Sequence, residues 1–77
     1  MIQPNKHLPQ ERALLTVGAE LLAQLEEPLT ISELWERLKR HRGKLALPIS
    51  FDWFVLSLSF LYTIAAIEYD GATIENK

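Results

Sequence analysis

The amino-acid sequence predicts a mainly α-helical domain that ends in a small β-hairpin, the order of elements in a winged helix-turn-helix-like fold. Three observations predict it. Apolar residues recur at helical spacing in three successive segments, a capping box opens the second, and an Asp-Gly pair divides the alternating residues 67–74. The order of these elements carries the prediction, because no signature motif is present. We divide the chain into an extended N-terminal segment, residues 1–8, and a single winged-helix-like domain, residues 9–77.

The composition bounds what the protein can be. The chain has 77 residues, of which 48% are hydrophobic and 23% charged, and it has no cysteine for a disulfide, a thiolate metal site or a nucleophile. At this length only about 60% of the unfolded surface is buried, so the core is modest. The net charge of −2 gives no global attraction to nucleic acid or acidic membranes. No apolar run approaches the ~18 residues of a spanning helix, and no signal peptide is recognisable, so we expect a soluble, cytoplasmic protein without membrane contact.

The first helix is expected from Pro9 to about Leu25. Proline suits the first turn of a helix, where its missing N–H costs nothing. Gly18 lies inside this helix and costs about 1 kcal/mol relative to alanine, so we expect another helix to approach closely there. The apolar face is predicted to contain Leu14, Leu15, Gly18, Leu21, Leu22 and Leu25.

The second helix is expected over residues 31 to about 42. The hydroxyl of Thr30 caps an unpaired backbone N–H and Glu33 reaches back to the cap residue, which together form a capping box. Gly43 is predicted to stop the helix. Residues 28–30, ahead of it, lie where a winged-helix fold often has a short strand.

The third helix, residues 51 to about 62, is the most apolar part of the chain. Ser50 caps it, and Asp52 in its first turn favours the helix dipole. Its side chains form two apolar sides. The broad side contains Phe51, Phe54, Val55, Leu58, Leu61, Tyr62 and Ala65. The second side contains Trp53, Leu56, Phe60 and Ile64. Such a helix needs two surfaces to bury against, and in a small domain the second can belong to another protein.

The hairpin is expected to turn through a two-residue type I′ turn at residues 70–71. This pairing places Ile67 opposite Ile74, so the apolar residues share one face.

A basic run near the end of the second helix is the one feature that suggests nucleic-acid binding. Its cations are Arg37, Lys39, Arg40, Arg42 and Lys44. They could contact phosphates, as in a winged-helix DNA-binding transcriptional regulator. Alternatively they form a solvated face, in which Glu33 pairs with Arg37 and Glu36 with Arg40 at i, i+4 spacing. We favour the solvated face, because such pairing leaves few free cations.

The third helix also argues against direct DNA contact. A major-groove helix needs Arg, Lys, Asn or Gln directed at base edges, and residues 50–66 contain none of these. In the hairpin, Glu68, Asp70 and Glu75 would repel phosphates.

No catalytic residue, cofactor site or metal site is expected, and we predict that the protein is not an enzyme. His7 and His41 are far apart in the sequence and have no second ligand at metal spacing. The serines lie outside any nucleophile-elbow context, and no Gly-rich phosphate loop is present.

Several segments carry a resemblance to a known family. They are Pro-Asn-Lys-His at residues 4–7, Thr-Ile-Ser-Glu-Leu-Trp at 30–35, Phe-Asp-Trp-Phe-Val-Leu at 51–56, Leu-Tyr at 61–62 and Ala-Ile-Glu at 66–68. Together they resemble the small middle component, type six, of bacterial ABC-three-component systems, over nearly the whole chain. Ala65 departs from the pattern, because such sequences tend to have glycine before the first wing strand. The sequence therefore does not define the residue at which the third helix ends.

The resemblance implies a bridging subunit without catalytic residues. It would work beside an ABC-type ATPase similar to SMC/Rad50 and a third system component, in defence against foreign DNA. By analogy, winged-helix subunits of SMC-like machines serve as protein-binding modules. We therefore predict a non-catalytic adaptor; a DNA-binding regulator is the alternative, and a homodimer is a third possibility.

The predicted partner surface extends the second side of the third helix. Trp53 and Phe60 fit either the domain's own core or an interface, where aromatic residues are favoured anchors. The full set is Trp53, Leu56, Phe60, Ile64, Leu45, Leu47 and His7. The two loop leucines would enlarge the patch, and His7 is included on the resemblance alone.

Overall fold

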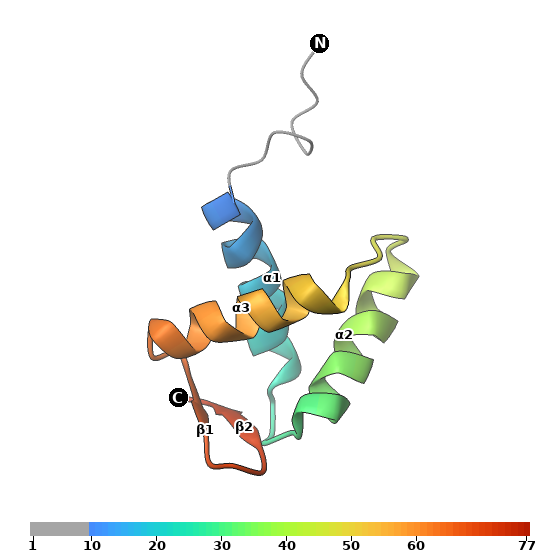
Figure 1. The fold of residues 1–77 in the computed structure, drawn as a ribbon. Helices are drawn as coiled ribbons and strands as arrows, with labels where there is room; N and C mark the ends of the chain where they lie inside the picture. Colours follow the sequence, from blue (N-terminus) through green and yellow to red (C-terminus); the bar gives the residue numbers. More distant parts are fainter. Residues whose placement is uncertain (1–9) are drawn as a thin grey trace.

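The computed structural model describes residues 10–77 and confirms the predicted fold class. Three helices are followed by a two-stranded antiparallel hairpin, an arrangement compatible with a winged helix-like fold (Figure 1). The elements are α1 (Gln10–Gln24), α2 (Ile31–Lys44), α3 (Phe51–Thr63), β1 (Ile67–Tyr69) and β2 (Ile74–Asn76). The predicted extended segment, the helix start at Pro9 and His7 lie outside the described residues.

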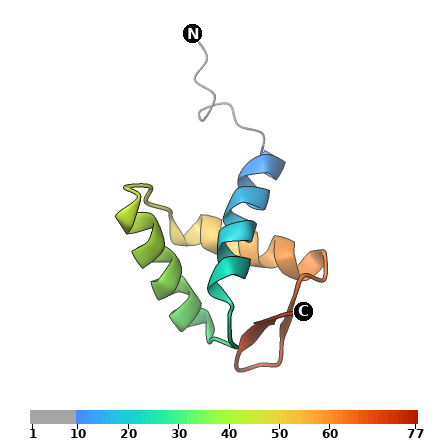
Figure 2. The ribbon, with the colours of Figure 1, turned by 180° about the vertical axis from the view of Figure 1, so that it is seen from behind.

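The core forms where α3 crosses α1, with α2 beside them and the hairpin at the far end of α3 (Figures 1 and 2). Its buried apolar residues are Val17, Leu21, Leu25, Leu29, Leu34, Leu38, Phe54, Leu61, Ile67 and Ile74. The close approach predicted at Gly18 is confirmed, because a Cβ atom there would lie 3.0 Å from Cδ2 of Leu61 on α3. Leu15 does not join the predicted apolar face and is 57% exposed, since the buried row of α1 runs through Val17 instead.

The start of α2 confirms the predicted capping box. The Glu33 amide donates to Oγ1 of Thr30 (3.1 Å), and the Thr30 amide donates to Oε1 of Glu33 (2.9 Å). Two backbone amides that the helix leaves without a partner are satisfied in this way.

The end of α2 differs from the prediction, because Gly43 lies inside the helix. The residue with left-handed backbone is Ala46 (φ 56°), beyond the C-cap residue Leu45. The amide of Leu47 donates to the carbonyl of Arg42 (2.9 Å), and the amide of Ala46 to that of Gly43 (3.2 Å). This is a Schellman motif, in which alanine occupies the position that usually holds glycine.

The end of α3, left open by the sequence, uses the same motif. Ala65 has left-handed backbone (φ 61°). Its amide donates to the carbonyl of Tyr62 (3.0 Å), while the amide of Ala66 donates to the carbonyl of Leu61 (2.9 Å). Ala65, which stands where similar sequences tend to have glycine, therefore has a backbone conformation that is strained for an L-residue.

The predicted hairpin forms, but the predicted pairing of its two strands is wrong. Tyr69 pairs with Ile74, and the amide of Asp70 donates to the carbonyl of Thr73, so the turn is centred one residue later. The carboxylate of Asp70 accepts hydrogen bonds from the amides of Ala72 and Thr73, both at 2.8 Å. These bonds favour the later turn, because the Asp70 side chain caps the amides of the two residues that follow Gly71 and so makes Asp70 the first residue of the turn.

The short strand predicted ahead of α2 is confirmed as a β-bridge. The Leu29 amide donates to the Ile74 carbonyl (3.0 Å), and the Ile74 amide donates to the Leu29 carbonyl (2.7 Å). This bridge ties the hairpin to the segment that leads into α2 and so fixes the position of the hairpin beside α3.

Candidate protein-binding surfaces

Helix α3 has one buried row and two exposed apolar flanks. Phe54, Ser57 and Leu61 are almost fully buried. The sequence predicts that one broad side is buried, yet Phe51 and Tyr62 on that side are 50% and 62% exposed. The prediction is wrong because the broad side covers more of the circumference of the helix than α1 can bury. Successive residues are about 100° apart around a helix, so the residues at the two edges of a wide apolar side point in different directions.

The buried row contains one polar side chain. Ser57 is completely buried, and its hydroxyl has no hydrogen-bond partner within residues 10–77. Ser57 lies in the row of α3 that packs into the domain, between Phe54 and Leu61. A small side chain there is compatible with the close crossing of α1 and α3.

The first flank is the predicted partner surface, here called the stripe. Its residues are Leu45, Leu47, Trp53, Leu56, Phe60 and Ile64. Leu45, Leu47, Leu56 and Ile64 are 44% to 53% exposed. The stripe thus runs from the loop before α3 along the helix to its C-cap residue.

The two aromatic residues of the stripe are partly buried. Phe60 packs against the core, whereas Trp53 lines a hollow of about 400 Å³ between α1 and the loop before α3. Each residue has part of its surface on the domain and part exposed, and contact of the exposed part with a partner stays a prediction. Such partly buried aromatic residues are rigid and suit an interface.

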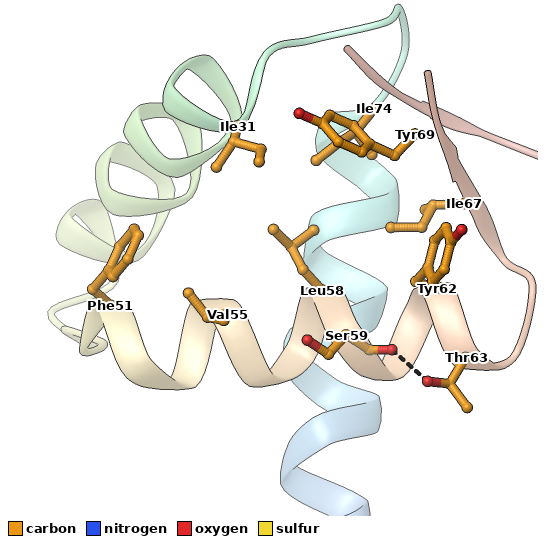
Figure 3. A pocket seen from close by; sticks show the side chains of 10 residues that line it. All are labelled: Ile31, Phe51, Val55, Leu58, Ser59, Tyr62, Thr63, Ile67, Tyr69 and Ile74. Carbon is orange, nitrogen blue, oxygen red and sulfur yellow. Dashed lines mark hydrogen bonds between the residues drawn. The ribbon is translucent and has the colours of Figure 1, made fainter. Parts of the chain in front are cut away.

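The second flank borders a groove that the sequence analysis does not predict. The groove has a volume of about 470 Å³. It is lined by Ile31 of α2, by Phe51, Val55, Leu58, Ser59, Tyr62 and Thr63 of α3, and by Ile67, Tyr69 and Ile74 of the hairpin. Figure 3 shows these side chains converging from the three elements. A signal was present in the sequence, because the apolar side of α3 is too wide to be buried by one neighbouring helix.

An aromatic cluster fixes one end of the groove. The ring of Phe51 lies 5.3 Å from that of Trp35 and 5.6 Å from that of Phe54, and Trp35 lies 5.0 Å from Phe54. These edge-to-face and tilted contacts hold the exposed Phe51 ring against the buried Phe54 and the partly buried Trp35. The groove wall is therefore rigid at this end.

The charges of α3 and the hairpin are all acidic. Between residues 51 and 76 the charged side chains are Asp52, Glu68, Asp70 and Glu75. None of them forms an ion pair with another described residue. Backbone hydrogen bonds from Thr73 and then Ala72 lower the pKa of the Asp70 carboxyl, so this group stays charged at neutral pH.

The basic run on α2 is largely neutralised, although not by the predicted partners. Arg37 pairs with Glu27 (3.0 Å) rather than Glu33, because Glu33 belongs to the capping box. Glu36 pairs with Lys39 (2.9 Å) instead of Arg40.

Arg42 is the most deeply placed cation of the run. It binds the Glu20 carboxylate of α1 with two nitrogens, at 2.6 and 2.9 Å, and donates to the Leu47 carbonyl at 3.3 Å. Arg40 and Lys44 form no ion pair within residues 10–77, and they lie with His41 around a polar hollow of about 290 Å³. Two cations are thus available to a nucleic acid, fewer than the sequence suggests.

No metal centre or membrane helix is found in the described part of the chain. Residues 10–77 contain no group of three His, Cys, Asp or Glu side chains placed to hold a metal ion. Nε2 of His41 lies 3.9 Å from Oε1 of Glu20, beside the Arg42 pair. None of the helices in these residues has the length and apolar character needed to cross a membrane.

The three helices and the C-terminal hairpin are compatible with a winged helix-like fold, and α3 has two apolar flanks. The chain belongs to the family of ABC-three component (ABC-3C) system Middle Component 6, whose family model matches residues 3–74. Searches of curated proteins and of solved structures gave no match. The resemblance found in the sequence is thereby confirmed, and membership of a multi-component system implies protein partners.

Proposed function

We propose that the protein is a non-catalytic adaptor that bridges the other components of its ABC-three-component system, in defence against foreign DNA. The resemblance suggests two partners, an SMC/Rad50-like ABC ATPase and a third component. The observation that supports the proposal is the character of α3, which exposes large apolar side chains on both flanks and contains no Arg, Lys, Asn or Gln to read bases. A bridging subunit needs two surfaces, and α3 offers two.

The stripe is the first proposed contact surface. Leu56 and Ile64 stay about half exposed in the folded domain, and burying the rest of each in a complex would contribute about 25 cal/mol per Å² of apolar surface. Trp53 supplies a rigid aromatic anchor at its centre. His7 stays a proposed contributor on the resemblance alone.

The test is co-purification of the tagged chain with the ATPase and the third component, expressed together and treated with nuclease. The wild-type chain is expected to retain at least one of them after nuclease treatment. The double variant Leu56→Glu, Ile64→Glu is expected to weaken retention by at least about tenfold, since it places charges in an apolar contact. Ala23→Glu is the matched control, because Ala23 is an exposed position on α1.

Two results would contradict the proposal. One is purification with DNA alone and no protein component, with binding lost in the variant Arg40→Glu, Lys44→Glu. That result would favour the DNA-binding regulator, for which the two unpaired cations are the supporting observation. The other is a stable homodimer by light scattering that the stripe variant disrupts while no other component binds. The regulator test leaves Arg42 unchanged, because its pair with Glu20 links α1 to α2.

A further inference from the structure

We infer that the groove between α2, α3 and the hairpin is a second docking site, and that it binds an amphipathic helix with lysine or arginine beside its apolar face, supplied by a partner protein. This inference rests on the proposed adaptor function, which it deepens by naming the chemistry of one partner. It concerns the flank of α3 opposite the stripe.

The groove has an apolar floor and an aromatic rim. Ile67 and Ile74 of the hairpin are buried at its base, while Phe51, Tyr62 and Tyr69 are about half exposed or more around it (Figure 3). Its volume of about 470 Å³ is within the range of binding pockets, roughly 300–1,000 Å³. Several apolar side chains of a partner can therefore enter side by side.

The walls suit a polypeptide helix better than a small polar ligand. The Thr63 hydroxyl, one of the few polar groups of the wall, donates to the Ser59 carbonyl of its own helix (2.8 Å). A small-molecule site usually encloses most of the surface of its ligand, whereas this groove is open to solvent. An open apolar groove instead accepts the face of an amphipathic helix, whose anchors recur at i, i+3, i+4 and i+7.

The charge around the groove favours a cationic partner. Asp52 lies on α3 beside the groove-lining Ser59 and Val55, and Asp70 lies at the hairpin tip next to Tyr69. Glu68 and Glu75 face each other across the strands, on the face of the hairpin opposite to Ile67 and Ile74, and add to the same negative potential. None of these four side chains has an ion-pair partner within residues 10–77, whereas Glu20, Glu27 and Glu36 are all paired. Lys77 lies beside Glu68 and Tyr69, but the four carboxylates outnumber it, so the charge around the groove stays negative.

A second copy of this chain is a poor match for the groove. The basic residues of the described chain are concentrated on α2, and the apolar face of α2 is already used in the core, where Leu34 and Leu38 are fully buried. An occupant must present basic and apolar side chains together on one exposed helix. The geometry therefore favours a different protein.

The test uses overlapping peptides of about 20 residues, about 30 Å long as helices. They are taken from the sequences of the ATPase and the third component of the same system. Binding to the full chain is measured by fluorescence anisotropy at about 50 and about 300 mM salt. The expected binders carry a net positive charge and apolar residues at helical spacing, become helical on binding by circular dichroism, and bind more weakly at the higher salt.

Variants on the two flanks make the result specific. Val55→Glu and Tyr62→Ala are expected to weaken peptide binding at least about tenfold, and Glu68→Lys with Glu75→Lys to slow association about tenfold. The stripe variant Leu56→Glu, Ile64→Glu is the matched control and should leave peptide binding unchanged. Both changed groove residues are exposed, so thermal unfolding should show that these variants fold.

Failure of this inference differs from failure of the adaptor function. If the full-length components co-purify but no peptide binds, or if the groove variants bind peptides as well as wild type, the inference is wrong and the adaptor function stands. Binders that are neutral or acidic would also overturn it, as would a homodimer that Val55→Glu disrupts. If neither a component nor a peptide binds, both proposals fail.

Discussion

The two flanks of α3 expose similar apolar side chains but have different surroundings. The groove flank faces a hollow between α2 and the hairpin, with an aromatic rim and the acidic side chains of α3 and the hairpin around it, while Lys77 lies beside Tyr62 and Tyr69. The stripe flank runs from the Leu45–Leu47 loop, close to the point where Arg42 joins Glu20 and the Leu47 carbonyl. The groove lies between three elements, whereas the stripe follows the helix and its loop and borders a separate hollow at Trp53. The difference shows that the chemistry of a surface depends on its neighbours as much as on the helix that carries it.

The comparison also explains why α3 is so apolar. A helix that packs against one neighbour needs a single apolar stripe, and the row of Phe54, Ser57 and Leu61 meets that need. Several further apolar residues on both flanks, such as Val55, Leu56, Tyr62 and Ile64, keep 43% or more of their surface exposed in the isolated domain. They are consistent with a helix that lies between two partners, as the proposed bridging role requires.

The largest expected effect is a difference in stability between substitutions in the buried row and in the stripe. Phe54→Ala should lower the free energy of unfolding by about 3–5 kcal/mol, because it removes a fully buried ring and leaves a cavity. Trp53→Ala should cost only about 1–2 kcal/mol, since that ring is partly exposed. Urea denaturation measures both. If Trp53→Ala unfolds the domain as Phe54→Ala does, Trp53 belongs to the core and the stripe loses its central anchor.

An intermediate effect is expected at the ion pair beside the stripe. Glu20→Ala should cost about 1–3 kcal/mol, because Arg42 and Glu20 are only 14% and 19% exposed and the arginine would lose its partner. Glu27→Ala, which breaks the exposed pair with Arg37, should cost no more than about 1 kcal/mol.

Thermal and urea unfolding of both variants measure this difference. Loosening the loop that carries Leu47 should also weaken stripe binding and leave groove binding unchanged. Equal stability losses for Glu20→Ala and Glu27→Ala would show that Arg42 does not anchor that loop.

The smallest effect is expected at the end of α3, where the hairpin wall of the groove begins. Ala65→Gly should raise the free energy of unfolding by about 1 kcal/mol, since it relieves the left-handed strain at φ 61°. Ala19→Gly, at an exposed position inside α1, should instead lower it by about 1 kcal/mol. The shift of the urea midpoint gives the sign in each case. A destabilising Ala65→Gly would mean that the chain leaves α3 by another route.

The sequence predicted elements whose causes are local. The capping box of Thr30 and Glu33 and the Ser50 cap depend on residues within a few positions of one another, and both form as expected. The hairpin also forms at the expected place, although with another register. The close approach at Gly18 was also predictable, because glycine inside a helix needs a reason. The predicted stripe has exposed leucine and isoleucine side chains, although its role in binding stays a prediction.

Predictions that depended on competition between partners failed. Glu33 was already used by the cap and so did not pair with Arg37, and the Asp70 carboxylate moved the turn by one residue. Gly43 has the right residue type for a helix stop, yet α2 continues until its Schellman motif forms at Ala46. In each case the sequence allowed two partners, turns or helix ends, and the contacts of the folded chain decided between them.

The sequence by itself determined the order of the elements, the character of α3 and the family to which the chain belongs. Only the tertiary structure decided which apolar residues are covered. A helix exposes its whole circumference until neighbours pack on it, and periodicity cannot say how wide a strip they will cover. Here α1 covers a narrow row of α3, and the Leu29–Ile74 bridge holds the hairpin beside its free flank. The groove exists because α2, α3 and the hairpin pack with a gap between them, and local sequence does not encode the spacing of these elements.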